Sequence, residues 1–237
     1  MAARSLSGRA TRWGHAPAGC RGPPHRAGDA TRERGGGRPG RSRVSWSDGP
    51  GKGGDDVETG LKQRLDYGDY AGIPADGLTY EILDGELYVT PAPSPMHQRV
   101  SKRLQRQLEA YFEARGLGEV FDAPIDLILT LHDVVQPDLV VVTDAARVSS
   151  RGIEGPPTLV VEVLSPSTRD RDRGVKGRRY AALGVPHYWL VDLDARRLEC
   201  FRLDGTAYVP SVEGQGDARV SLPDWPGLEI ALAELWR

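Results

Sequence analysis

Apolar residues from about residue 80 onward follow patterns that predict mostly strands. Two apolar-rich segments over residues 80–90 are joined by Asp84-Gly85, a dipeptide typical of a tight β-hairpin. Further strands are predicted where apolar residues alternate or run together, over residues 119–130, 134–142, 158–165, 188–192, 197–203, 207–209 and 220–222. We expect these strands to form a mostly meandering sheet.

Helical periodicity appears in two main places between the predicted strands. Apolar residues recur at helical spacing over residues 100–112, after the proline-rich segment 91–95 and before Gly116. A second helix is predicted from about Thr168 to Leu183, where Gly184 and Pro186 end it. A short amphipathic helix is expected over residues 228–235. The whole pattern indicates a mixed α/β domain.

Composition divides the chain after residue 56. Residues 1–56 hold 11 Lys and Arg against 5 Asp and Glu, whereas residues 57–237 hold 20 against 28. The first segment is rich in Arg, Gly and Pro and has too little apolar surface to offset its ordering entropy. We therefore predict that residues 1–56 are a disordered extension and that residues 57–237 form one domain.

The basic extension has three interpretations. It could be an arm that binds nucleic acid, because basic blocks often contact phosphates. A transit peptide is disfavoured, since the segment has no amphipathic helix. It could also be a stretch without function, translated upstream of the true start site.

The sequence lacks the features of disulfide-rich, zinc-binding, membrane-spanning and secreted proteins. The two cysteines, Cys20 and Cys200, support neither a disulfide framework nor a zinc site, so a cytoplasmic location is expected. No apolar run is long enough to predict a membrane span, and the N-terminus lacks the apolar region of a secretory signal.

Two strand-like apolar runs each contain one carboxylate. Asp138 lies within residues 134–142 and Glu162 within residues 158–165. Side chains alternate across a strand, so Glu162 should share a face with Val160 and Leu164, and neighbouring strands could bring both acids together. Two carboxylates a few ångströms apart need a proton or a cation between them. Hard divalent cations prefer such oxygens, so the pair predicts a metal-dependent site.

Lys176 is the third candidate. With Arg173, Tyr180 and Leu183 it forms one stripe of the second helix, which should place its amine beside the residues that face the sheet. The alternative is a surface lysine whose apolar stem lies along the helix.

Less specific interpretations of the acids also stay open. Asp138 could only cap a turn beside Pro137, and Glu162 could pair with Arg173 or Arg179. Glu81 is left out of the predicted site because it points away from its apolar neighbours in the first hairpin.

Motifs in a fixed order connect these candidates with a known family. The segments are 80–86 (YEILDGE), 93–97 (PSPMH), 136–141 (QPDLVV), 161–168 (VEVLSPST), 171–176 (RDRGVK) and 184–192 (GVPHYWLVD). Their order resembles the Uma-two family of proposed endonucleases, in the PD-(D/E)XK restriction-endonuclease-like superfamily. The resemblance covers about residues 60–205, and only the ordered set is specific.

The resemblance implies a restriction-endonuclease-like mixed central sheet flanked by helices, with an αβββαβ core and extra β-hairpins. Asp138 matches the aspartate of the PD element, and Glu162 matches the acid of the (D/E)XK element. Leu164 stands where that element would have its lysine, so Lys176 of the following helix is expected to replace it.

The same resemblance implies an endonuclease that uses Mg²⁺ or Mn²⁺. Asp138, Glu162 and the backbone carbonyl of Val163 would hold the ion, with waters completing the octahedron. Lys176 would orient the attacking water, help to deprotonate it, or offset phosphate charge.

Glu86 and His97 match recurrent positions of the family. Glu86 would join the metal shell or serve as a base. His97 would contact a phosphate or orient a carboxylate, although a local polar contact at a helix start is the simpler alternative.

The expected partner is nucleic acid, with DNA favoured, and cutting both strands of a duplex would favour a homodimer. The alternative is a catalytically silent nucleic-acid-binding or protein-interaction module; a glycosidase is disfavoured by an aromatic content of only 7%. A basic groove is expected from residues of the two helices: Arg99, Lys102, Arg103, Arg106, Arg169, Arg171, Arg173, Arg178 and Arg179.

Overall fold

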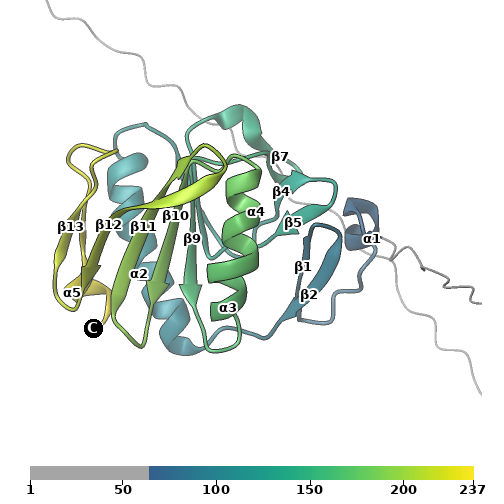
Figure 1. Ribbon diagram of the computed structural model, residues 1–237, viewed down its shortest axis with the longest axis horizontal. Coiled ribbons are helices and arrows are strands. Elements are labelled where there is room, and N and C mark those ends of the chain that lie inside the picture. The colour runs from purple at the N-terminus through teal and green to yellow at the C-terminus, as the bar shows by residue number, and fades with distance from the viewer. Residues whose placement is uncertain (1–63) are drawn as a thin grey trace, which may run out of the picture. The chain divides into compact units, whose positions relative to one another are not determined.

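The computed structural model describes residues 64–237, so the predicted extension 1–56 lies outside the described residues. These residues form two six-stranded sheets, a two-stranded ribbon and few helices (Figure 1). The fold is therefore mixed α/β, as predicted. Within this range no helix has the length and apolar character needed to cross a membrane.

The central sheet has the strand order β12-β11-β10-β9-β6-β3. Its strands are β3 (Glu119–Asp122), β6 (Leu139–Val142), β9 (Leu159–Leu164), β10 (His187–Asp192), β11 (Arg197–Asp204) and β12 (Ala207–Gln215). All neighbours are antiparallel except β9 and β10, which run parallel and need a crossover connection. That crossover consists of α3 (Arg169–Arg171), a π-helical turn (Asp172–Lys176) and α4 (Gly177–Ala182).

A long helix, α2 (Pro95–Phe112), precedes β3 and begins at Ser94, whose hydroxyl caps its first turn. The elements α2, β3, β6, β9, α4 and β10 thus follow one another in the predicted αβββαβ order. Additional strands between β3 and β9 belong to the second sheet.

This second, lateral sheet has the order β2-β1-β5-β4-β8-β7. Its strands are β1 (Thr79–Leu83), β2 (Glu86–Thr90), β4 (Leu127–Thr130), β5 (Asp133–Val135), β7 (Val148–Ser149) and β8 (Gly152–Glu154). The predicted hairpin is confirmed as β1–β2, with Asp84 and Gly85 at φ 52° and 80°, as a two-residue hairpin turn requires. The remaining elements are α1 (Tyr67–Ala71), a 3₁₀ turn (Ala145–Arg147), β13 (Arg219–Ser221), β14 (Glu229–Ala231) and α5 (Leu232–Leu235).

The helices cover opposite faces of the central sheet, and β9 shows this most clearly. Its residues Val161 and Val163 pack in one apolar cluster with Leu104 of α2. Val160 belongs to a second cluster, with Tyr180 of α4. Because side chains alternate along a strand, Glu162 shares the α4 face with Val160.

Four segments differ from the predicted pattern. Residues 119–130 and 134–142 each form two strands of different sheets, because Pro124 and Pro137 lack the N–H that a continuous ladder needs. Residues 143–157, for which no strand was predicted, contain β7 and β8. The expected helix over 228–235 begins only at Leu232, after strand β14.

Candidate active site

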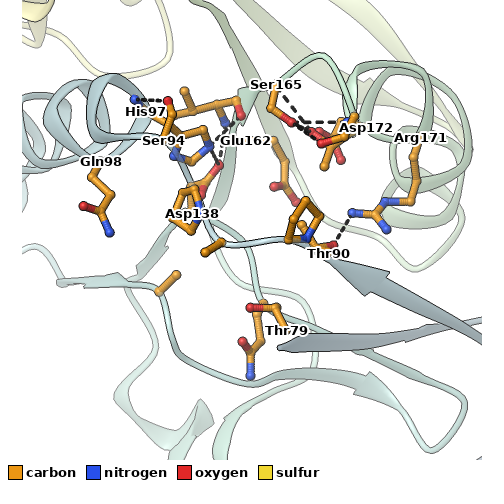
Figure 2. A pocket seen from close by; sticks show the side chains of 18 of the residues that line it. Thr79, Thr90, Ser94, His97, Gln98, Asp138, Glu162, Ser165, Arg171 and Asp172 are labelled. Carbon is orange, nitrogen blue, oxygen red and sulfur yellow. Dashed lines mark hydrogen bonds and ion pairs between the residues drawn. The ribbon is translucent and has the colours of Figure 1, made fainter. Parts of the chain in front are cut away.

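A cavity of about 490 Å³ collects most of the predicted site residues. Its walls come from β1 and β2 of the lateral sheet, the start of α2, the segment before β6, the end of β9 and the helical crossover. Figure 2 shows His97, Asp138, Glu162, Arg171 and Asp172 around this space. The cavity is where segments far apart in the sequence meet.

Asp138 lies directly before β6 and is fixed by two neighbours. Its Oδ2 accepts a hydrogen bond from the Val163 backbone N–H at 2.7 Å and lies 3.2 Å from His97 Nε2. The same nitrogen lies 2.8 Å from the Val163 carbonyl oxygen, which can only accept. His97 Nε2 must therefore carry the proton and hold both oxygens.

The pKa of His97 is raised by this arrangement. Burial alone would lower it, but the hydrogen bond to Asp138, the charge of Asp138 and the bond to the Val163 carbonyl together outweigh burial. His97 is therefore placed to orient the carboxylate of Asp138, which is one of the roles expected for it.

Glu162 is buried, with 4% of its surface exposed. Its Oε1 accepts hydrogen bonds from Lys176 Nζ and from the Tyr180 hydroxyl, both at 2.9 Å. No described residue donates a hydrogen bond to its Oε2. The alternative partners are wrong, since Arg173 pairs with Glu199 and Arg179 with Asp133. Lys176 is 2% exposed, which also rules out the surface-lysine alternative.

Glu81, which the sequence analysis left out, is a direct partner of Lys176. Its Oε1 lies 2.8 Å from Lys176 Nζ and accepts the Gln136 backbone N–H at 3.0 Å. The omission was wrong because the face of β1 that carries Glu81 looks into the cavity rather than into solvent. Asp138 and Glu162 were selected because each is a carboxylate within an apolar strand. The same criterion also selects Glu81.

The π-helical turn adds a fourth acid, Asp172. The Gly177 N–H bonds to the Asp172 carbonyl, five residues back, which widens the turn. Asp172 Oδ1 lies 3.7 Å from Lys176 Nζ, four residues further along the chain, and both side chains line the cavity. Arg173, which was predicted on the same stripe as Lys176, does not line this cavity and pairs with Glu199 instead. The sequence showed no signal for this turn.

Glu86 is not part of this cavity. It is exposed at the start of β2, where its Oε2 accepts a hydrogen bond from the Tyr88 hydroxyl at 3.2 Å. Glu86 is separated from Glu81 by the hairpin turn, and the cavity lining includes Glu81 instead. The predicted place of Glu86 in a metal shell therefore has no geometric support.

Negative charge exceeds positive charge in the cavity. Four carboxylates, those of Glu81, Asp138, Glu162 and Asp172, face the cations of Lys176 and Arg171. Burial raises the pKa of Glu162 well above its usual range, and the other acids oppose the lowering effect of Lys176. Burial likewise raises the pKa of Asp172. Such a cluster favours an additional proton or cation.

The donor atoms fit a hard divalent cation. Glu81 Oε2 and Asp172 Oδ1 are buried without a hydrogen-bond donor in the described part of the chain, although Arg171 and Lys176 lie 3.3 and 3.7 Å from them. The donors to Glu162 both bind its Oε1. Within residues 64–237 no group of three or more His, Cys, Asp or Glu side chains is arranged for one metal ion. Mg²⁺ commonly uses one or two carboxylates and keeps several waters, so Asp138 and Glu162 suffice for that mode.

The charge excess predicts an unusual pH dependence of stability. The raised pKa values of Glu162 and Asp172 mean that the folded state binds protons more tightly than the unfolded state, so stability is lost as pH rises. The raised pKa of His97 acts in the same direction, and the lowered pKa of His187, which is caused by burial, opposes it. The lowered pKa of Asp133 acts only at acidic pH. Without divalent ions, the free energy of unfolding should fall between about pH 5 and about pH 8.

Urea denaturation in EDTA at several pH values measures this trend. Glu162→Gln removes one of the responsible groups and should flatten the slope. A free energy of unfolding that rises across the same interval would contradict the predicted charge excess.

Five of the nine cations of the predicted basic groove already have partners within the protein. Arg103 donates to the Leu235 carbonyl, and four other arginines are ion-paired with acids: Arg169, Arg171, Arg173 and Arg179. Among the described residues, Arg99, Lys102, Arg106 and Arg178 form no ion pair. Nucleic acid would thus meet a few free cations rather than a continuous basic surface.

Comparisons with known proteins agree with this architecture. Residues 67–233 match the family model Uma2, described as "Putative restriction endonuclease". A crystal structure of "a putative nuclease belonging to DUF820" from Anabaena variabilis ATCC 29413 shares the fold, with a TM-score of 0.58 and 16% identity, covering 73% of this chain and 97% of that one.

One sequence relative is an uncharacterized protein, slr1290, from Synechocystis. It is 34% identical over 103 residues, which are 43% of this chain and 54% of the relative, so the match spans about half of that protein. The family match, by contrast, extends over most of the chain and contains the whole cavity. The chain belongs to the Uma2 family.

Proposed function

We propose that the protein is a metal-dependent endonuclease that hydrolyses phosphodiester bonds, with DNA as its substrate. The family description and the nuclease title of the structural neighbour support this proposal. The observation that carries it is the meeting of Asp138, Glu162 and Lys176 in one cavity with an excess of carboxylates. For duplex DNA the proposal includes a homodimer, since two strands require two cavities.

Asp138, Glu162 and the Val163 carbonyl would hold Mg²⁺ or Mn²⁺. When bound, the ion would polarise the scissile phosphate and make a bound water more acidic. The Val163 carbonyl could still bind the ion, because a carbonyl oxygen has two lone pairs and His97 uses only one of them. His97 would hold Asp138 in the orientation required for the ion.

Lys176 would act as a fixed positive charge. Burial alone would lower its pKa, but Glu162, Glu81 and Asp172 outweigh burial and raise it, so the ammonium keeps its proton. The expected role in deprotonating water is therefore replaced by electrostatic stabilisation of the phosphate in the transition state. Tyr180 would support this role by holding the Glu162 carboxylate.

Cleavage assays test the proposal directly. The full-length protein should cut plasmid, linear duplex or single-stranded DNA in Mg²⁺ or Mn²⁺ and not in EDTA. Cleavage of RNA alone would contradict DNA as the substrate. Asp138→Asn should abolish cleavage and weaken Mn²⁺ binding measured by calorimetry, because it removes one carboxylate of the proposed pair. Asp170→Asn, an exposed change on the crossover, is the matched control.

The outcomes separate the alternatives. Cleavage that survives EDTA or Asp138→Asn would overturn the metal site. Absence of both cleavage and metal binding would favour the silent module on the same fold.

A further inference from the structure

A second cavity, of about 530 Å³, lies on the α4 face of the central sheet. Gly177, Arg178 and Ala181 bound it on the helix side, and strands β10 to β12 bound it on the other. It shares no lining residue with the candidate active site. Nothing in the proposed function uses it, and its volume lies in the range of about 300–1,000 Å³ typical of small-molecule sites.

The small residues of α4 create the space. Gly177 and Ala181 are one turn apart, so this face of the helix carries almost no side-chain bulk opposite the strands. A Cβ atom at Gly177 would lie only 3.5 Å from the Tyr188 ring, so this ring packs directly against the helix at that point. The open space lies beside this contact, between the helix and the Phe201 and Tyr208 rings.

The rings offer flat apolar surface and few polar atoms. Tyr188 and Tyr208 are stacked, with ring centroids 5.5 Å apart and planes tilted by 25°. Their hydroxyls are already used, because Tyr188 donates to the Asp172 carbonyl and Tyr208 to the Val185 carbonyl, each at 2.9 Å. Phe201 adds a third ring. A planar ring that stacks would suit this wall better than a sugar or a polar peptide.

The rim carries one uncompensated cation. Arg173 at this rim is paired with Glu199, whereas Arg178 is exposed and forms no ion pair or hydrogen bond within residues 64–237. A free guanidinium beside an aromatic wall favours a phosphate joined to a flat ring. One cation fits a single phosphate rather than a long polyanion.

We propose that this cavity binds a nucleoside monophosphate, with its base against Tyr208 and Phe201 and its phosphate on Arg178. The site also adjoins the candidate active site through Tyr188, whose hydroxyl holds the backbone of Asp172. Binding here is independent of the proposed cleavage, and its test does not require activity.

Calorimetric titration of the full-length protein with adenosine 5′-monophosphate, in EDTA, tests this site. One equivalent should bind, and adenosine or inorganic phosphate should each bind about tenfold more weakly or worse, because each offers half of the contacts. Arg178→Ala should weaken binding of the monophosphate by about tenfold and leave adenosine unchanged. Arg106→Ala, which removes another unpaired arginine, is the matched control.

A second pair of variants locates the binding. Ala207→Phe should fill the cavity from its exposed rim and abolish binding, whereas Ala182→Phe, exposed on α4 outside the cavity, should not. Binding that survives both Arg178→Ala and Ala207→Phe would overturn the site. So would equal binding of inorganic phosphate, no binding at millimolar concentration, or binding of single-stranded oligonucleotides without binding of the monophosphate.

Discussion

Replacing Lys176 with methionine is expected to lower the free energy of unfolding by about 3–5 kcal/mol, as removal of one partner from a buried ion pair typically does. Lys176 is 2% exposed, and its ammonium lies within 2.9 Å of carboxylate oxygens of Glu81 and Glu162. Methionine fills a similar volume but leaves Glu81, Glu162 and Asp172 with Arg171 as the remaining cation of the cavity. The loss should be larger at pH 8 than at pH 5, because the acids can take up protons at the lower pH.

Urea denaturation followed by circular dichroism measures this effect. Lys102→Met, on the exposed side of α2, removes the same charge and should change stability by less than about 0.5 kcal/mol. A loss below about 1 kcal/mol in Lys176→Met, independent of pH, would mean that the carboxylates are already protonated in the absence of a metal ion.

Glu162→Gln is expected to reduce Mg²⁺-dependent cleavage on the order of 10³-fold without a matching loss of stability. A metal ion contributes several kcal/mol to stabilising transition-state charge, and each 1.4 kcal/mol or so corresponds to a factor of ten. The glutamine keeps an oxygen for Lys176 and Tyr180, while Lys176 still faces Glu81 and Asp172. Because the cavity holds more carboxylates than cations, removing one of them should leave the free energy of unfolding at pH 8 unchanged or higher.

Steady-state cleavage rates and urea denaturation on the same preparations decide this prediction. Glu213→Gln, on the exposed part of β12, is the control and should affect neither quantity. A variant that loses stability and activity together would make Glu162 a structural residue, and a fully active variant would remove it from the site.

The opposite stability effects expected for Lys176 and Glu162 come from one cause. The cavity holds more acid than the cations of the chain neutralise, so losing the cation is costly and losing an acid is not. This arrangement is typical of sites whose function outweighs local stability.

The sequence alone determined the elements whose signals are local. The Asp84-Gly85 hairpin and α2 were predicted because turn residues and helix periodicity act over a few residues. The αβββαβ order was expected from the family resemblance. Asp138, Glu162 and Lys176 were selected because a charged group in an apolar pattern requires compensation wherever the pattern folds.

Tertiary structure decided which of these residues meet. Pro137 divides one apolar run between two sheets, and β1, which pairs with β5 of that run, carries Glu81 to Lys176. The crossover places Asp172 beside Lys176 and Arg173 beside Glu199, and the hairpin leaves Glu86 outside the cavity. The pairing of distant strands cannot be read from the periodicity of a sequence, and neither can a π-helical turn. The positions of these charged side chains therefore became known only from the tertiary structure.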